Sequence, residues 1–204
     1  MRLSDLSARQ IARAEVIYRA ALPWGADATK AALMTAAAES SFLLYANDGS
    51  TKRWDVAPAW RDIARQSLGF DHDAVAPKIP ASTPAGTWDT TADSVGHFQQ
   101  RPMYDYGTVA ELMDPAESTR IFIRGSHAGT GRTRKFLDSP AGLSLAARCQ
   151  WTQGSEFPTG DNYAPMVQVA DELIARFGPI GPANPTRTAA DWLRLFATAV
   201  AGKE

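Results

Sequence analysis

The 204-residue chain contains one cysteine, Cys149, so no disulfide can form within it. No apolar run approaches the roughly 18 residues of a membrane-spanning helix. Residues 1–10 also lack the uninterrupted apolar core of a secretory signal peptide. Neither sign of charge dominates, because 21 Lys and Arg stand against 22 Asp and Glu. A general nucleic-acid binder needs surplus cations to neutralise phosphates, so we expect no nucleic-acid partner and no membrane span.

Metal and cofactor chemistry also lack their usual patterns. The three histidines, His72, His97 and His127, are scattered and have no metal-ligand spacing. Cys149 ends an apolar helical run, 145–149, where a buried inert thiol is the usual outcome. Gly129-Thr130-Gly131 has no strand before it, which argues against a phosphate-binding loop. We therefore expect no metal and no cofactor.

The dominant pattern in the chain is helical periodicity. An amphipathic stripe is formed by Ile11, Ala14, Tyr18 and Leu22, and Pro23-Trp24-Gly25 ends it. An alanine-rich helix is then predicted from an N-cap at Asp27 towards Phe42. Further helices are predicted over about 58–68, 118–124 and 141–151, and from Asp161 or Asn162 with a stripe of Val167, Ala170, Ile174 and Phe177. No alternating pattern predicts a large sheet, so the expected fold is mainly α.

Proline and glycine divide the chain. Pro77, Pro80, Pro84 and Gly86 predict a long loop, while Asn47-Asp48-Gly49-Ser50 predicts a turn. A Gly/Pro-rich linker is predicted over 178–185, after a domain spanning 1–177. An amphipathic helix over 186–204 follows, with Thr188 and Asp191 resembling a capping box. This helix is expected either to dock back on the domain or to contact a protein partner.

One acidic residue stands out. Glu39 lies near the end of the alanine-rich helix, where the helix dipole disfavours an anion and favours the protonated carboxyl. Later in the chain, Ser94-Val95-Gly96-His97-Phe98-Gln99-Gln100-Arg101 predicts a turn rich in neutral hydrogen-bonding groups. One acid among neutral amides suits the cleavage of a sugar chain better than phosphate, metal or nucleotide chemistry.

These segments resemble the lysozyme-like superfamily over roughly residues 10–177. Within it, they are most similar to the goose-type and lytic-transglycosylase-like domains of actinobacterial wall hydrolases and of phages that infect those bacteria. The matching segments, in order, are 37–42, 45–49, 93–102, 111–115, Gln150, 155–158 and 163–164. The resemblance implies a lysozyme-like (α+β) fold with a minimal sheet and a long cleft-side loop. It also implies cleavage of the β-1,4 bond between N-acetylmuramic acid and N-acetylglucosamine in peptidoglycan.

By this resemblance Glu39 corresponds to the general acid, since the leaving oxygen needs a proton and a buried carboxyl can hold one. Substrate-binding groups are expected at Ser94, Gln99, Gln100, Tyr104 and Tyr163. Asp93 is the first candidate for a second catalytic carboxylate, with Asp48 and Asp89 behind it. Without such a carboxylate, the N-acetyl group or 6-hydroxyl of the substrate would serve. Hydrolase and lytic transglycosylase both stay open, with hydrolase favoured.

Two departures from the family pattern motivate an alternative function. His97 stands where these domains usually have Leu, which predicts a more polar or pH-sensitive turn, and 124–132 is unusually rich in Gly. The alternative is a catalytically inactive structural or wall-binding module, for example of a phage tail. Trp54, Trp60 and Trp88 are expected mostly in the core, with contact to the glycan as the less favoured alternative. Without a signal peptide, the expected setting is a phage lysin made in the host cytoplasm that acts after release or within a virion.

Overall fold

The computed structural model describes residues 1–76, 84, 92–126, 134–154 and 159–178. In those ranges the chain forms seven α-helices and one two-stranded sheet, so the prediction of a mainly α fold with a minimal sheet is confirmed. The helices are α1 (Ala8–Ala21), α2 (Ala26–Ser40), α3 (Pro58–Arg65), α4 (Val109–Met113), α5 (Pro115–Arg124), α6 (Leu145–Gln153) and α7 (Val167–Phe177). The strands are β1 (Tyr45–Ala46) and β2 (Ala74–Val75).

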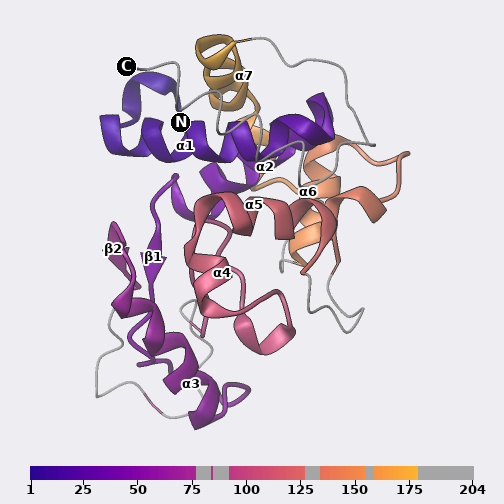
Figure 1. Ribbon diagram of the computed structural model, residues 1–204. Coiled ribbons are helices and arrows are strands. Elements are labelled where there is room, and N and C mark those ends of the chain that lie inside the picture. The colour runs from indigo at the N-terminus through magenta and orange to yellow at the C-terminus, as the bar shows by residue number, and fades with distance from the viewer. Residues whose placement is uncertain (77–83, 85–91, 127–133, 155–158, 179–204) are drawn as a thin grey trace.

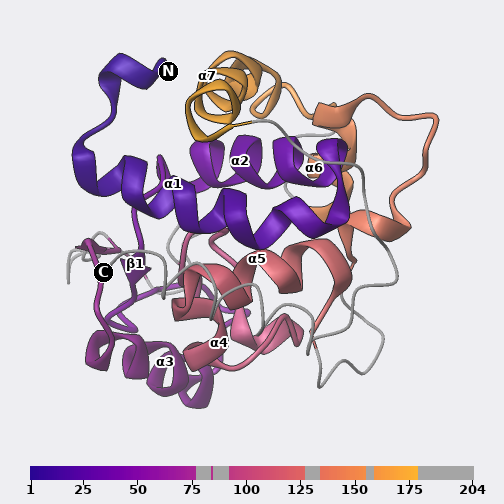
Figure 2. The ribbon, with the colours of Figure 1, turned by 45° about the horizontal axis from the view of Figure 1, so that its top comes forward.

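Helix α2 lies at the centre of the fold. It contacts α1, α5, α6 and α7, and Figures 1 and 2 show α7 on one side of the α1–α2 pair and α5 on the other. Buried residues occur on all sides of α2, as is usual for a helix enclosed by others. Its alanines allow these close approaches because their side chains are small. Helix α2, which carries Glu39 near its end, is thereby held by four neighbouring helices.

Helix α1 packs against α2 and buries part of the stripe that the sequence predicts. Its N-terminus is closed by a capping box between Ser7 and Gln10. Ala14 and Tyr18 are buried as expected, whereas Ile11 and Leu22 are only partly buried. Ile17 and Ala21 complete the buried stripe.

Four predicted helix starts differ from the observed ones. Helix α5, predicted from residue 118, begins at Pro115 after the N-cap Asp114. Gly25, not Asp27, is the N-cap of α2, because its φ of 89° ends the preceding 3-10 turn. Asp27 lies in the first helical turn and pairs with Arg148 at 3.0 Å. Helix α6 begins after Ser144, whose side chain accepts a hydrogen bond from the backbone of Ala147.

Helix α7 begins later than predicted because the 3-10 helix Ala164–Met166 precedes it. Its buried face also differs from the predicted stripe. Val169, Ala170 and Leu173 are buried, whereas Val167 is exposed. The true face is therefore displaced around the helix from the stripe that begins at Val167.

A smaller unit containing β1, β2 and α3 lies to one side of the helical body (Figure 1). The strands are parallel, with Tyr45 opposite Ala74 and Ala46 opposite Val75. The predicted turn after β1 is confirmed: Asn47 and Asp48 each accept a backbone hydrogen bond from two residues ahead. A second apolar cluster joins this unit to α4 and α5, and its buried members are Leu44, Ala46, Val95, Val109, Leu112, Met113 and Ile121.

Several predictions fall outside the described residues. They are the linker 178–185 beyond Gly178, the helix over 186–204, and most of the proline-containing loop with Trp88 and Asp89. Gly129-Thr130-Gly131 and the matching segment 155–158 also fall outside. In the ranges that the structure covers, no helix combines the length and apolar character needed to cross a membrane.

Candidate functional site

Glu39 is the next-to-last residue of α2, and its carboxyl group is partly buried. The helix ends in the left-handed conformation at Ser41, which has a φ of 53°. The phenol of Tyr163 donates a hydrogen bond to Oε1 of Glu39 over 2.5 Å. Burial raises the pKa of Glu39, and hydrogen bonds from Tyr163 and Gln153 oppose this change only in part. The site therefore contains a carboxyl group that retains its proton to a higher pH than an exposed glutamic acid.

Tyr163 is fully buried, so it orients Glu39 rather than presenting its ring to a ligand. Its position depends on the preceding turn, where the backbone N–H of Tyr163 donates to the carbonyl of Gly160 at 2.9 Å. Gly160 has a φ of 78°, and a Cβ there would lie 2.6 Å from the carbonyl oxygen of Ala146. This close approach fixes the turn against α6, and Tyr163 with it.

Removing the Tyr163 hydroxyl should raise the pKa of Glu39 further, because the lost hydrogen bond stabilises the ionised carboxylate. We expect a higher Glu39 pKa in Tyr163→Phe than in the wild type, measured by NMR titration of the ¹³C-labelled side-chain carboxyl. Tyr18→Phe is the matched control, since that hydroxyl bonds to the carbonyl of Gly178 instead. An unchanged or lower Glu39 pKa in Tyr163→Phe would refute the assigned hydrogen bond.

The turn at 94–100 is attached to the small sheet. Gly96 donates its backbone N–H to Tyr45 over 2.8 Å, and Val95 pairs with Gln100. Only glycine fits at position 96, because its φ is 77° and a Cβ would lie 2.2 Å from the carbonyl oxygen of Leu112. The amide of Gln99 closes the turn by donating to the Gly96 carbonyl at 2.8 Å.

Gln153 connects this turn to Glu39. Its side-chain amide donates to the carbonyl of Phe98 at 2.6 Å and accepts from Gln100 at 3.3 Å. The same side chain favours the ionised form of Glu39 and so lowers the pKa of that carboxyl, against the effect of burial. Gln100 is buried, and its Oε1 has no hydrogen-bond partner within the described structure. Glu39 and Gln100, predicted as site residues, thus share one neighbour.

The sequence interpretation missed Gln153. A lone glutamine near a helix end has no distinguishing pattern, although it follows Gln150, which belongs to the matching segments, by three positions on α6. Tyr106 also belongs to this site. Burial raises the pKa of Tyr106, and the negative charge of Glu39 adds to that effect, while Arg134 opposes it. The phenol oxygen of Tyr106 lies 3.5 Å from the carbonyl oxygens of Thr152 and Gln153.

Asp93 is placed in the interior rather than at an open catalytic position. Its side chain has 0% exposure, and one oxygen accepts a hydrogen bond from Arg101. The other oxygen accepts the backbone N–H of Met103 at 3.2 Å. Both oxygens are therefore occupied by the chain itself. Ser94 beside it is also buried, and its carbonyl accepts from the side-chain amide of Asn47 at 3.1 Å.

The other candidate carboxylates differ in their surroundings. Asp48 accepts the backbone N–H of Ser50 at 2.9 Å, as a turn residue does. Asp55, which the sequence interpretation did not select, pairs with Arg53 at 2.9 Å and with Arg101 at 3.3 Å. Hydrogen bonds and charge from these two arginines hold the pKa of Asp55 far below its usual range.

Arg101 extends this network to Tyr104. It donates to the Tyr104 hydroxyl at 3.0 Å, and its guanidinium carbon lies 4.4 Å from the ring centroid. Tyr104 is 47% exposed, so this predicted substrate-binding residue is accessible to a ligand.

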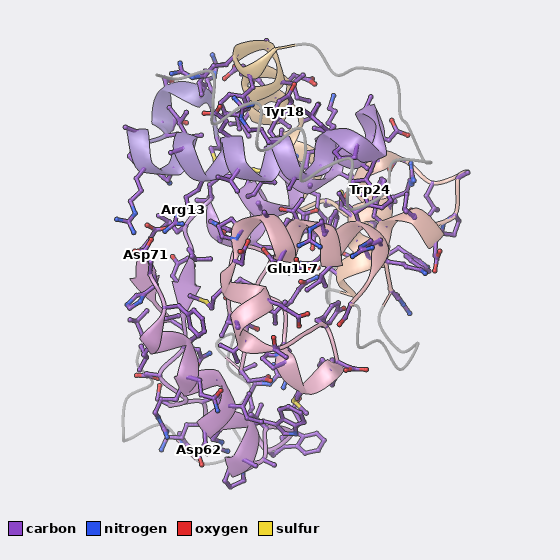
Figure 3. The ribbon with its side chains drawn as sticks, viewed as in Figure 1. Arg13, Tyr18, Trp24, Asp62, Asp71 and Glu117 are labelled. Carbon is purple, nitrogen blue, oxygen red and sulfur yellow. The ribbon has the colours of Figure 1, made fainter. Side chains whose placement is uncertain are left out.

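His97 is fully buried and lies close to a charged cluster between α1 and the loop before β2. Figure 3 shows Arg13 and Asp71 of this cluster side by side, and their side chains are 2.7 Å apart. Burial and, to a smaller extent, the charge of Arg13 lower the pKa of His97 to about 3, although Asp73 and the Leu43 backbone oppose the shift. His97 is therefore neutral near neutral pH. The expected pH sensitivity of this turn lies in the acid range.

Replacing His97 by Leu should make the protein less sensitive to acid. The unfolded state binds a proton near pH 6.5, but the folded state does so only near pH 3. Between these values the unfolded state holds more protons, so the free energy of unfolding falls as the pH falls. We expect a smaller loss of Tm between about pH 7 and about pH 4 in His97→Leu, measured by circular dichroism. Equal losses of Tm in the wild type and in His97→Leu would contradict the lowered pKa of His97.

Cys149 is fully buried, and its thiol lies 3.7 Å from the carbonyl oxygen of Ala31. Burial raises the pKa of Cys149 to about 12, so the thiol is protonated and poorly nucleophilic near neutral pH. Within the described ranges, no three His, Cys, Asp or Glu side chains gather as a metal-binding group.

Comparisons with known proteins identify no family for this chain. No protein-family model matches the chain, and no curated protein matches it significantly.

Proposed function

We propose that the protein cleaves the glycan strand of peptidoglycan at the β-1,4 bond between N-acetylmuramic acid and N-acetylglucosamine. Glu39 is the general acid. The observation that carries this proposal is the Glu39 carboxyl, whose pKa is raised by burial and which Tyr163 and Gln153 hold beside the 94–100 turn. The resemblance of this turn and of the Glu39 segment to lysozyme-like domains supports the choice of substrate.

In the proposed reaction, Glu39 transfers its proton to the glycosidic oxygen as the bond from that oxygen to C1 breaks. A raised pKa is what this step needs, because the acid must be protonated at the pH where the enzyme works. The leaving sugar departs with a hydroxyl group. The electron-poor C1 then bonds to a water oxygen, giving hydrolysis, or to the 6-hydroxyl oxygen of the same sugar, giving an anhydro product. In either case the proton lost by the attacking oxygen returns to the Glu39 carboxylate, directly or through solvent.

We assign Asp93 a positioning role in this proposal. A carboxylate that activates water must reach that water, whereas both oxygens of Asp93 are occupied and its side chain has no exposure. Asp93 instead holds Arg101 next to the Gln99–Gln100 turn. Without Asp93 as a base, the substrate's own N-acetyl oxygen or 6-hydroxyl would attack C1, or a residue outside the described ranges would activate the water.

The test is mass spectrometry of soluble fragments released from purified actinobacterial peptidoglycan. The proposal predicts fragments with N-acetylmuramic acid at the cleaved end. Reducing ends would identify a muramidase, and 1,6-anhydro ends would identify a lytic transglycosylase. No release by the folded protein would leave the inactive structural or wall-binding module in place of the enzyme.

The proposed setting is a phage lysin that acts on the wall after release or as part of a virion. It depends on the enzyme proposal and on the resemblance to lysozyme-like domains of actinobacterial phages.

A further inference from the structure

Trp54 is the most exposed large apolar side chain in the described structure. Its side chain is 76% exposed, although tryptophan is usually mostly buried. The sequence interpretation expected it mostly in the core, so this is a correction for Trp54, while Trp60 on α3 is partly buried. An exposed indole leaves a large apolar surface in water, and a ligand that covered this surface would gain from its burial.

The backbone that carries Trp54 is held on both sides. Arg53 before it is 7% exposed, and Asp55 after it accepts two hydrogen bonds from the Arg53 guanidinium at 2.9 Å each. Asp55 also accepts from Arg101 at 3.3 Å. A fork-shaped arginine–carboxylate pair is rigid and geometrically specific. The indole is thus presented to solvent from an ordered segment.

A second exposed aromatic ring is attached to the same network. Arg101 donates to the Tyr104 hydroxyl at 3.0 Å and lies against one face of that ring. Arg101 therefore links Trp54, through Asp55, to Tyr104. The α3 segment and the 3-10 helix Pro102–Tyr104 are in contact, which agrees with this connection.

The network continues towards the proposed acid. Gln100, the residue before Arg101, donates to Gln153, and Gln153 acts on Glu39 by lowering the pKa of its carboxyl. From Gln153 to Asp55 each step is a hydrogen bond or a chain neighbour. A linear polymer cut at Glu39 needs further contacts along its length, and this line of residues leads to the two exposed rings.

From this continuity we infer that Trp54 and Tyr104 form an aromatic platform that binds the glycan strand away from the cleaved bond. The inference rests on the proposed function. The ligand class is a β-1,4-linked chain of N-acetylated hexosamines, whose apolar C–H faces cover aromatic rings while their hydroxyl and amide groups stay hydrated. The neighbouring groups, Arg101 and Asp55, are bound to each other, so the platform selects a neutral sugar face rather than a charge.

The experiment measures binding and cleavage separately. Binding to amidase-treated, peptide-free glycan strands is measured by sedimentation in a Glu39→Gln background. Trp54→Ala and Tyr104→Ala should each weaken binding about tenfold, in the range of a dominant aromatic contact. In the active background, Trp54→Ala should raise KM for long strands and leave kcat unchanged. Trp54→Phe should restore most of the binding, because a ring is retained.

Phe70→Ala is the matched control, since Phe70 is also exposed, at 39%, and lies in the loop before β2. It should bind glycan as tightly as the parent. Unchanged binding in both Trp54→Ala and Tyr104→Ala, or equal losses in Phe70→Ala, would overturn the platform. If the wild type binds strands through Trp54 but releases no fragments, the enzyme proposal fails and the platform stands. If the wild type releases fragments but Trp54→Ala and Tyr104→Ala bind glycan normally, the enzyme proposal stands and the platform fails.

Discussion

Glu39→Gln is expected to abolish the release of soluble fragments from peptidoglycan while leaving the protein folded. The amide is nearly the same size as the carboxyl group but has no proton to give to the glycosidic oxygen. General acid catalysis contributes on the order of 10²–10⁴ in rate, so fragment release should fall at least a hundredfold. Because the substituted side chain still reaches Tyr163 and Gln153, the Tm should change little. The measurement pairs mass spectrometry of released fragments with a thermal melt.

Glu15→Gln is the control for this experiment. Glu15 lies on the exposed face of α1 and forms an i,i+4 pair with Arg19, which contributes little to stability. We expect wild-type fragment release from Glu15→Gln. Undiminished release from Glu39→Gln would exclude Glu39 as the acid, whatever the products of the wild type prove to be.

Asp93→Asn is expected to destabilise the fold by about 3 kcal/mol, the lower end of the cost of breaking a buried ion pair from one side. The substitution removes the charge that faces Arg101 inside the protein and replaces an oxygen that accepts from the chain with an amide N–H₂. Arg101 would then retain Asp55 as its only carboxylate partner in the described structure. Chemical denaturation followed by circular dichroism measures the loss.

This experiment separates a positioning role for Asp93 from a catalytic one. A positioning residue predicts lower stability with kcat largely retained below the melting transition, and partial rescue by Asp93→Glu. A catalytic base predicts wild-type stability and no activity. Asp62→Asn is the control, because Asp62 is an exposed residue of α3 (Figure 3) whose ion-pair partner among the described residues is the nearby Arg65. Its effect should be below about 1 kcal/mol.

The order of the helices could be predicted from the sequence because their signals are local. The alanine-rich run, the stripe containing Ala14 and Tyr18, and Pro58 at the start of α3 each act within a few turns of chain. Helix starts were harder to predict. Gly25 displaces the expected cap at Asp27 because a 3-10 turn precedes it, and such turns leave little trace in periodicity.

The site could be predicted only in part, because some of its residues have a recognisable local sequence context and others do not. Glu39 and the Gly96 turn have recognisable local context, and the structure connects them through Gln153. Gln153 has no such context, since its importance arises from where the end of α6 meets the end of α2. Asp93 looks like a free acid in the sequence, yet Arg101, eight positions later, occupies it.

By itself, the sequence determined that this protein is mainly helical, that no disulfide can form within the chain, and that its most distinctive acid ends an alanine-rich helix. Only the tertiary structure decided whether each carboxyl group is buried, shifted in pKa or paired with an arginine. Burial raises the pKa of Glu39 and the Arg101 pair encloses Asp93, while Asp55 and Arg53 hold the segment that exposes Trp54. The physical reason is that helix formation depends on neighbours in the chain. Desolvation and ion pairing depend on neighbours in space, which residues distant in sequence supply.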